Sequence, residues 1–233
     1  AILIWQKALD ISPNNPRAYT NLAAAYGGLE QYNEALEACT QAIKLKPDCT
    51  EAYSNLTNIY VRLGKYEDVI TAAEKTIKLR PNFAESYNNL GLAYGQLGRY
   101  DEAVAACSMA VKLKPYLAEA HCNLGASYNK LNRFAEAIQQ CKEAIRLKPA
   151  YADAYYNLGT IYNKLGRYNE AAEAYKQAVK IKPDFVDACF NLGIAYRRLG
   201  RYPEAVEAYR QALEIRPDLA EVHNDLGVAY GQL

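Results

Sequence analysis

The six cysteines are the first residues of this sequence that could do chemistry, by binding a metal or by forming disulfides. No Cys-x-x-Cys pair occurs, which is a common spacing in zinc and redox sites. Cys39, Cys107 and Cys141 share one row of a repeating pattern, in which Tyr175 and Tyr209 occupy the later places. Such a row indicates small apolar side chains in a core. We therefore expect no metal site. Six packed thiols fit a reducing compartment, the cytoplasm.

The two histidines are the remaining candidates for acid–base catalysis. His121 and His223 occupy a row that holds tyrosine elsewhere, as at Tyr87, and we interpret them as aromatic substitutes. They lie 102 residues apart, three units of the repeating pattern, and cannot meet within one chain. No serine lies in a Gly-x-Ser-x-Gly frame, and no phosphate-binding glycine loop occurs. The sequence therefore predicts no catalytic residue and no cofactor.

One polar pattern has a specific chemical meaning, a row of asparagines that recurs every 34 residues. Its members are Asn21, Asn55, Asn89, Asn123, Asn157 and Asn191, with Asp225 in the seventh place. An amide offers both a hydrogen-bond donor and an acceptor. A row of amides can therefore pair with the N–H and C=O groups of an extended peptide, whatever its side chains. The alternative is that these amides serve local helix contacts, and the sequence leaves both interpretations open.

Charged residues accompany this asparagine row. An acidic residue lies four positions before most of its members, as Glu85 lies before Asn89, whereas Arg17 lies before Asn21. Seven positions after the row, the residues are polar or basic in most repeats, as at Arg62. This face carries few large apolar groups, so we expect it to line a solvated groove.

Bulk composition excludes other classes of protein. The 233 residues are 51% hydrophobic and 23% charged, which favours a soluble globular chain. Lys and Arg number 27 and Asp and Glu number 26, so the net charge of +1 disfavours a nucleic-acid binder. No apolar run approaches the roughly 18 residues of a membrane span. We expect a protein partner, with no nucleic acid and no membrane.

The elements that position these residues follow the same period of 34. Rows of proline, tyrosine, leucine and alanine share one register, which chance cannot produce. Residues 1–15 and 220–233 form partial repeats, so the chain looks like a piece of a longer array, and we expect 1–233 to form a single domain. The six full repeats are 16–49, 50–83, 84–117, 118–151, 152–185 and 186–219.

Each repeat predicts two helices. In 84–117, apolar residues keep helical spacing up to Leu97, and Gly98 then ends the first helix. We expect Asp101 to cap the second helix, and Pro115 to stop it. Counting a partial repeat at each end, the sequence predicts an all-α fold of fourteen helices. One pair cannot bury its apolar faces alone, so neighbouring pairs must stack.

The pattern Tyr-x-x-Leu-Gly-x-x-Tyr, followed by Ala, Ala and Pro, resembles the tetratricopeptide repeat (TPR) family. Residues 87–94 match it together with Ala103, Ala110 and Pro115, and the resemblance covers the whole chain. It implies a right-handed α-solenoid superhelix of helix-turn-helix repeats, lined on its concave side by the first helices. It also implies protein–protein interaction and no catalysis, so that the chain is not an enzyme.

The asparagine row is similar to the asparagine ladder of O-linked N-acetylglucosamine transferase superhelices. Two functions stay open. The first is a scaffold that holds an extended peptide or protein segment in the concave groove. The second is a substrate-recruiting TPR appendage of a larger enzyme, such as a glycosyltransferase, with catalysis outside this chain. The carboxylate clamp of chaperone-binding members needs Lys and Arg where this chain has mostly acids and asparagines, and those would repel a terminal carboxylate.

The two partial repeats leave apolar residues without a neighbouring helix. These are Ile2, Leu3, Trp5 and Leu9 in the first partial repeat, and Leu226, Val228 and Tyr230 in the last. Each edge supplies what the other lacks, and a head-to-tail contact of this kind need not close. We therefore expect concentration-dependent end-to-end self-association.

Overall fold

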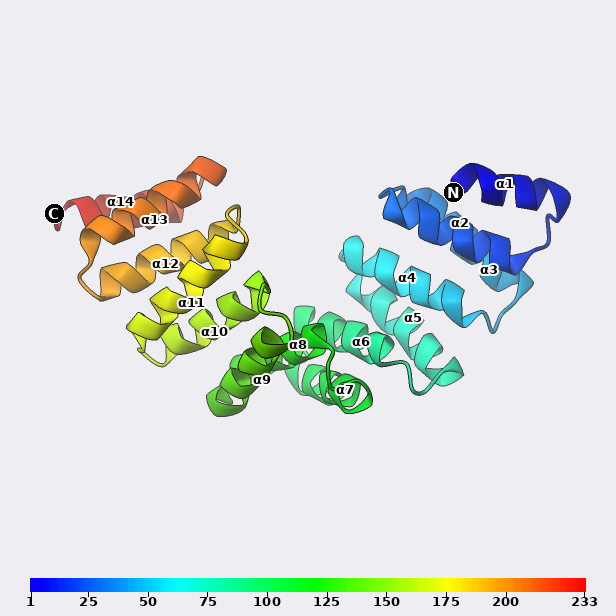
Figure 1. Cartoon of the computed structure of the whole chain (residues 1–233), viewed down its shortest axis with the longest axis horizontal. Helices are drawn as coiled ribbons and strands as arrows, with labels where there is room; N and C mark the ends of the chain where they lie inside the picture. The colour runs from blue at the N-terminus through cyan, green and yellow to red at the C-terminus, as the bar shows by residue number, and fades with distance from the viewer. The chain divides into compact units, whose positions relative to one another are not determined.

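A computed structural model describes all 233 residues and contains fourteen α-helices and no β-strand. The all-α fold predicted from the sequence is therefore confirmed. None of the helices combines the length and apolar character needed to cross a membrane. The chain divides into two compact units, residues 1–115 and 116–233, whose helices are labelled in Figure 1.

The first unit contains half of a repeat followed by three helix pairs. Its helices are α1 (Ile2–Ile11), α2 (Pro16–Gly28), α3 (Tyr32–Leu45), α4 (Thr50–Arg62), α5 (Tyr66–Leu79), α6 (Ala84–Gln96) and α7 (Tyr100–Leu113). Even-numbered helices are the first helices of their repeats, and odd-numbered helices are the second.

The second unit contains three helix pairs followed by one further first helix. Its helices are α8 (Ala118–Lys130), α9 (Phe134–Leu147), α10 (Ala152–Lys164), α11 (Tyr168–Ile181), α12 (Val186–Arg198), α13 (Tyr202–Ile215) and α14 (Ala220–Tyr230). The recurrence of 13-residue first helices and 14-residue second helices reflects the sequence period.

Within each unit the helices form two layers. First helices contact one another, as α2 contacts α4 and α10 contacts α12, whereas second helices contact only first helices. The layer of first helices is therefore the more tightly spaced one, and its free side is the inner face of each unit. Consecutive helix pairs stack in the manner of an α-solenoid.

Each first helix ends in the same turn. In the third full repeat, the backbone N–H of Arg99 donates to the carbonyl of Tyr94 at 2.9 Å, and Gly98 between them has a φ of 76°. Glycine suits this left-handed backbone because it has no Cβ to clash. The second helix then begins at Tyr100 with Arg99 as its N-cap, so the prediction of Asp101 as the cap is wrong. Asp101 lies in the first turn, where a carboxylate favours the helix dipole.

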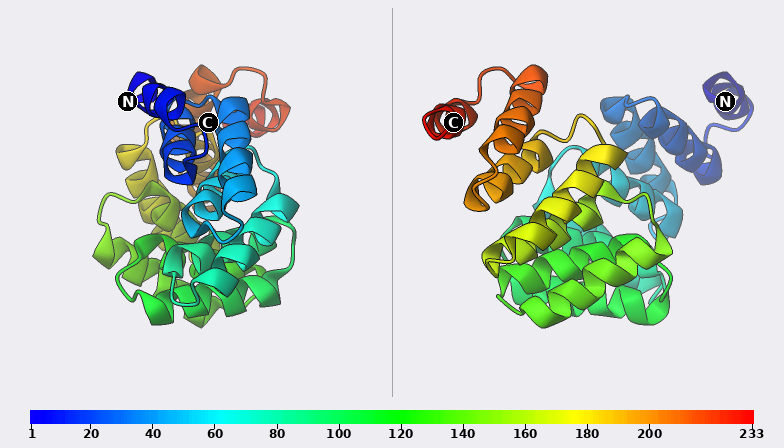
Figure 2. Two further views of the ribbon diagram at one scale, coloured as in Figure 1. Left: turned by 90° about the vertical axis from the view of Figure 1, so that its right-hand side faces the viewer. Right: turned by 60° about the vertical axis from the view of Figure 1, so that its left-hand side comes forward.

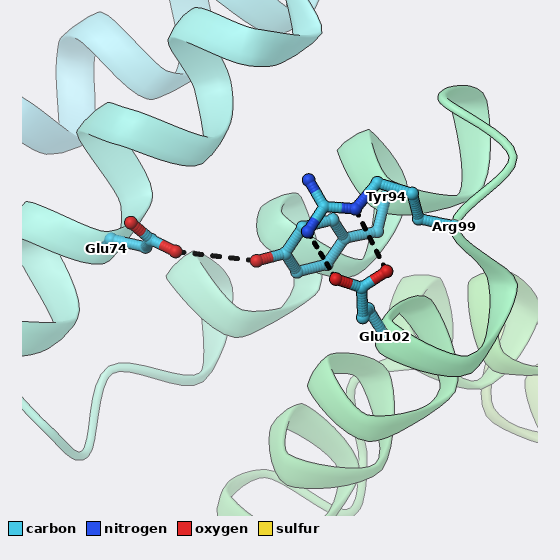
Figure 3. Close-up of polar contacts among 4 residues, drawn as sticks. All are labelled: Glu74, Tyr94, Arg99 and Glu102. Atoms are coloured by element: carbon cyan, nitrogen blue, oxygen red, sulfur yellow. Dashed lines mark hydrogen bonds and ion pairs between the residues drawn. The ribbon is translucent and has the colours of Figure 1, made fainter.

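Side chains also brace this turn, as Figure 3 shows. The guanidinium of Arg99 lies 4.4 Å from the ring centroid of Tyr94 and pairs with Glu102 of the second helix. The hydroxyl of Tyr94 donates to Glu74 of the preceding repeat at 3.4 Å. The bond from Arg99 is the main reason that the pKa of Glu102 lies below its ordinary value. Arg133, Arg167 and Arg201 stack on Tyr128, Tyr162 and Tyr196 in the same way.

The two helices of a repeat approach closely where a small residue faces a side chain sixteen positions later. A Cβ added to Gly91 would lie 2.3 Å from Sγ of Cys107, and one added to Gly193 would lie 2.4 Å from Cε1 of Tyr209. These partners are fully buried. The glycines therefore set the distance between the two helices of their repeats.

The end helices differ in part from the sequence-based expectation. In α1, Ile2, Trp5 and Leu9 are half-buried against the first unit's core, and the exposed apolar side chains are Leu3 and Ile4. In α14, Leu226 packs on the second unit's core, whereas Val228 and Tyr230 are exposed. Figure 2 shows α1 in dark blue and α14 in red, each at an edge of its own unit.

Candidate functional site

The asparagine row lies along the middle of the first helices. Each member immediately precedes the leucine that anchors its helix in the core, as Asn157 precedes the buried Leu158. Every side chain of the row is half-buried, so each reaches the inner face without being fully exposed. The members are Asn21 on α2, Asn55 on α4, Asn89 on α6, Asn123 on α8, Asn157 on α10 and Asn191 on α12.

Most of these amides use their donor within the chain. Three reach back 35 residues to the preceding first helix: Asn55 Nδ2 to the carbonyl of Thr20 at 3.0 Å, Asn157 Nδ2 to Sγ of Cys122 at 3.3 Å, and Asn191 Nδ2 to Oη of Tyr156 at 3.4 Å. Asn89 donates instead to Oδ1 of Asn58 at 3.1 Å. The row therefore joins neighbouring first helices within each unit.

The acceptor side of the row is not consumed by these contacts. The Oδ1 atoms of Asn55, Asn157 and Asn191 accept no hydrogen bond from the chain, and Asn21 makes no side-chain hydrogen bond at all. The two interpretations of the row are thus compatible, because a donor can serve helix contacts while the acceptor faces a ligand. Asp225 differs, since it accepts from Oη of Tyr209 at 3.5 Å and contacts a guanidinium.

The acidic residues before the row face cations from the ends of second helices. Nζ of Lys114 lies 2.7 Å from Glu85, Nζ of Lys148 lies 3.2 Å from Glu119, and a guanidinium nitrogen of Arg216 lies 3.8 Å from Asp187. Each pair is separated by 29 residues. Partial burial pushes the pKa of Glu85 upward, but the bonds from Lys114 and the backbone outweigh it, and the pKa lies below its ordinary value.

Basic residues near the ends of the first helices have no such partners. Arg62, Lys130 and Arg198 form no ion pair, and Nζ of Lys164 donates to the backbone carbonyl of Asn129 at 3.2 Å. Burial, and secondarily the charge of Lys130, lowers the pKa of Lys164. Because the acids are largely neutralised and these cations are not, the uncompensated charge of the inner face is positive.

Two cavities of the first unit border the asparagine row. One of about 450 Å³ is lined by Arg17, Asn21 and Lys46. The other, of about 400 Å³, lies between α2 and α4, where Gly28 leaves room beside Asn55. Their polar and charged linings suit hydrogen-bonding groups of a ligand rather than a purely apolar molecule.

The cysteines and histidines do not form a reactive centre. All six cysteines are free and buried. Burial raises the pKa of Cys39 and of Cys122 to about 12, which keeps both thiols protonated. His121 is buried with Nδ1 at 2.7 Å from Gln140, and no three His, Cys, Asp or Glu side chains gather where they could hold a metal.

Alkaline conditions are expected to weaken the fold because of these thiols. A cysteine with an ordinary pKa of 9.0 ionises in the unfolded chain well before Cys39 does in the folded chain. Its contribution is therefore complete below pH 9 and is lost as the pH rises towards about 12. Urea unfolding at intervals across this range measures the loss. The Cys39→Ala variant, which lacks one of these groups, should lose less stability, and an equal slope in both proteins would refute the assignment.

Comparisons with known proteins agree with this geometry. The family model described as TPR repeat matches residues 57–98, 127–166, 159–200 and 195–233. The model described as Tetratricopeptide repeat matches residues 16–49 and 84–117. Together these matches cover most of the chain. No curated protein sequence matches the chain significantly.

Many solved structures are similar to this chain. A chain of the APC/C hetero-tetramer Cut9-Hcn1 has a TM-score of 0.87 at 20% identity, covering 97% of this chain and 45% of that one. The MamA protein has a TM-score of 0.59 at 33% identity, covering 74% of this chain and 94% of its own. YrrB, described as a TPR protein with an unusual peptide-binding site, has a TM-score of 0.64 at 24% identity, covering 81% and 97%. This chain thus spans less than half of the Cut9-Hcn1 chain that it matches.

Proposed function

Because the chain belongs to the tetratricopeptide repeat family, we propose that it is a protein–protein interaction scaffold that binds an extended peptide or protein segment along the first helices. The observation that supports this proposal most is the set of unpartnered Oδ1 atoms on successive first helices, at Asn55, Asn157 and Asn191. Each can accept a backbone N–H from the bound segment. Recognition of this kind depends on the backbone and tolerates many side chains.

The spacing of the row suits such a ligand. Packed helices lie about 8–10 Å apart, and an extended chain advances about 3.3 Å per residue. One acceptor on each first helix therefore meets about every third residue of an extended segment. The residues between these contacts can vary, which favours partners of low sequence complexity or partial disorder. The positive inner face adds a preference for segments that are not strongly basic.

We assign catalysis to no residue of this chain, since TPR arrays act in general as interaction modules. A balanced charge of 27 basic and 26 acidic residues favours a protein partner over a nucleic acid. Six buried free thiols support a reducing compartment, and we place the chain in the cytoplasm on that basis.

Selection from a random library of displayed twelve-residue peptides tests the function. Selected peptides are then added to the ¹⁵N-labelled chain, and the side-chain amide resonances of Asn55, Asn157 and Asn191 are followed by NMR. We expect these resonances to shift, while that of Asn169, which is exposed on the second helix α11, stays in place. Selected peptides that shift only second-helix resonances, or a library that yields no binder, would contradict the proposal.

The exposed apolar side chains of the end helices predict self-association of this 233-residue chain. Leu3 is 74% exposed on α1, and Val228 is 46% exposed on α14. Contact between these surfaces removes apolar area from water and can extend without closing. Light scattering over a dilution series should show mass rising with concentration. The Leu3→Glu variant should stay monomeric, whereas a strict monomer in both proteins at high concentration would exclude the contact.

A further inference from the structure

The first full repeat reverses a charge that other repeats keep. Lys114 pairs with Glu85, and Lys148 pairs with Glu119, each across 29 residues. At the equivalent places of the first full repeat stand Arg17 and Lys46, so a second cation replaces the acid. Neither Arg17 nor Lys46 forms an ion pair, and both side chains are exposed. The partner that neutralises this position elsewhere is therefore missing here.

A cavity of about 450 Å³ lies between these two cations. Asn21 and Thr20 line it as well, one turn further along α2 from Arg17. Asn21 is available as both donor and acceptor, because it makes no side-chain hydrogen bond, unlike Asn55 on the next first helix. Thr20 is committed, since its hydroxyl donates to the carbonyl of Pro16 at 2.8 Å. The cavity thus combines two unpaired cations with one unpaired amide.

We propose that this cavity binds the carboxylate of an acidic side chain, Asp or Glu, carried by the segment that occupies the inner face. The inference rests on the proposed function. The carboxylate takes the place that Glu85 and Glu119 fill in their repeats, between a first-helix position and a second-helix end. The amide of Asn21 then pairs with the backbone beside the acidic residue. One such contact fixes the register of a segment that the asparagine row alone would let slide.

The site differs from a carboxylate clamp, because its second cation comes from the end of a second helix and not from a neighbouring first helix. One acid, Glu51, also lines the cavity. It extends as well into an adjacent cavity of about 150 Å³ that Arg80 lines. Its position, within reach of the same cavity, makes it a competitor for the two cations. Removing its charge should therefore strengthen binding of an acidic residue.

Matched peptides test the inference. The probes are acetyl-Ser-Ala-Ser-Glu-Ser-Ala-Ser-amide, the same peptide with Gln for Glu, and the Gln peptide with a free terminal carboxylate. Binding is followed by NMR at the side-chain amide of Asn21. We expect the Glu peptide to bind at least about tenfold more tightly than the Gln peptide, with a difference that shrinks as salt rises. Tight binding of the free-carboxylate peptide alone would overturn the assignment to a side chain.

Two variants sharpen the result. Arg17→Glu recreates the acid–lysine pairing seen between Glu85 and Lys114, so it should fold normally and lose the preference for Glu over Gln. Glu51→Gln should change binding in the opposite direction and increase that preference. Equal binding of the Glu and Gln peptides by the unaltered chain, with shifts along the asparagine row, would overturn the inference and leave the proposed function standing. Absence of binding by every peptide would overturn both.

Discussion

Replacing Gly193 by alanine is expected to destabilise the second unit by about 1–3 kcal/mol, the usual cost of overpacking. The new Cβ would lie 2.4 Å from Cε1 and 2.5 Å from Cδ1 of Tyr209. Tyr209 is fully buried among the helices of its unit, so its ring has no free space to enter. Relief requires α12 and α13 to move apart, which exposes the apolar surface between them.

Gly227 provides the matched control for this change. It occupies the same row on α14, but an added Cβ would meet nothing within 4 Å. Alanine there should be neutral or stabilising, because it is a better helix former than glycine by up to about 1 kcal/mol. Urea unfolding followed by circular dichroism compares the two variants. Equal effects at Gly193 and Gly227 would show that helix propensity decides the outcome, and not the contact with Tyr209.

The double variant Asn157→Ala, Asn191→Ala is expected to weaken a groove-bound peptide by about thirtyfold. Each lost acceptor removes a hydrogen bond worth about 1 kcal/mol, and about 2 kcal/mol corresponds to that factor. The same change also removes the contacts of these amides with Cys122 and Tyr156 on the preceding first helices. Isothermal calorimetry measures the affinity, and Asn169→Ala on α11 is the control that should leave it unchanged.

Aspartate variants separate the two roles of these amides. Asn157→Asp and Asn191→Asp keep an acceptor oxygen for the peptide but lose the donor to the preceding helix. We expect these variants to retain most of the peptide affinity while unfolding at a lower urea concentration. The alanine variants should lose both properties. If aspartate and alanine variants lose affinity equally, the donor is the important atom and the assignment of Oδ1 as the peptide acceptor is wrong.

The helix pairs could be predicted from the sequence because their signals are local and repeated. Gly98 needs its left-handed backbone whatever surrounds it, and Pro115 stops a helix in any context. The start of the second helix was harder to predict. Arg99 becomes the N-cap because its own N–H returns to Tyr94, and Asp101 is thereby shifted into the helix. That bond depends on the turn as a whole, and not on the capping preference of one residue.

The chemistry of the inner face could be predicted only in outline. The period places an asparagine on each first helix, but the rotation of neighbouring helices decides that Asn55 reaches Thr20 with its donor. The stacking of Arg99 on Tyr94 recurs along the sequence as an arginine row, yet its meaning requires the folded turn. Arg17 stands out from the sequence as an exception to the acidic row, but only the fold brings Lys46 to the same cavity.

An N-methyl scan of a selected peptide tests recognition of the backbone by the asparagine row most directly. Methylation removes one N–H at a time and leaves every side chain unchanged. We predict that methylation at about every third residue weakens binding by about tenfold, while the positions between tolerate it, and that a scrambled peptide of the same composition still binds. Uniform tolerance of N-methylation, together with loss of binding on scrambling, would show that side chains are recognised instead and would contradict the account.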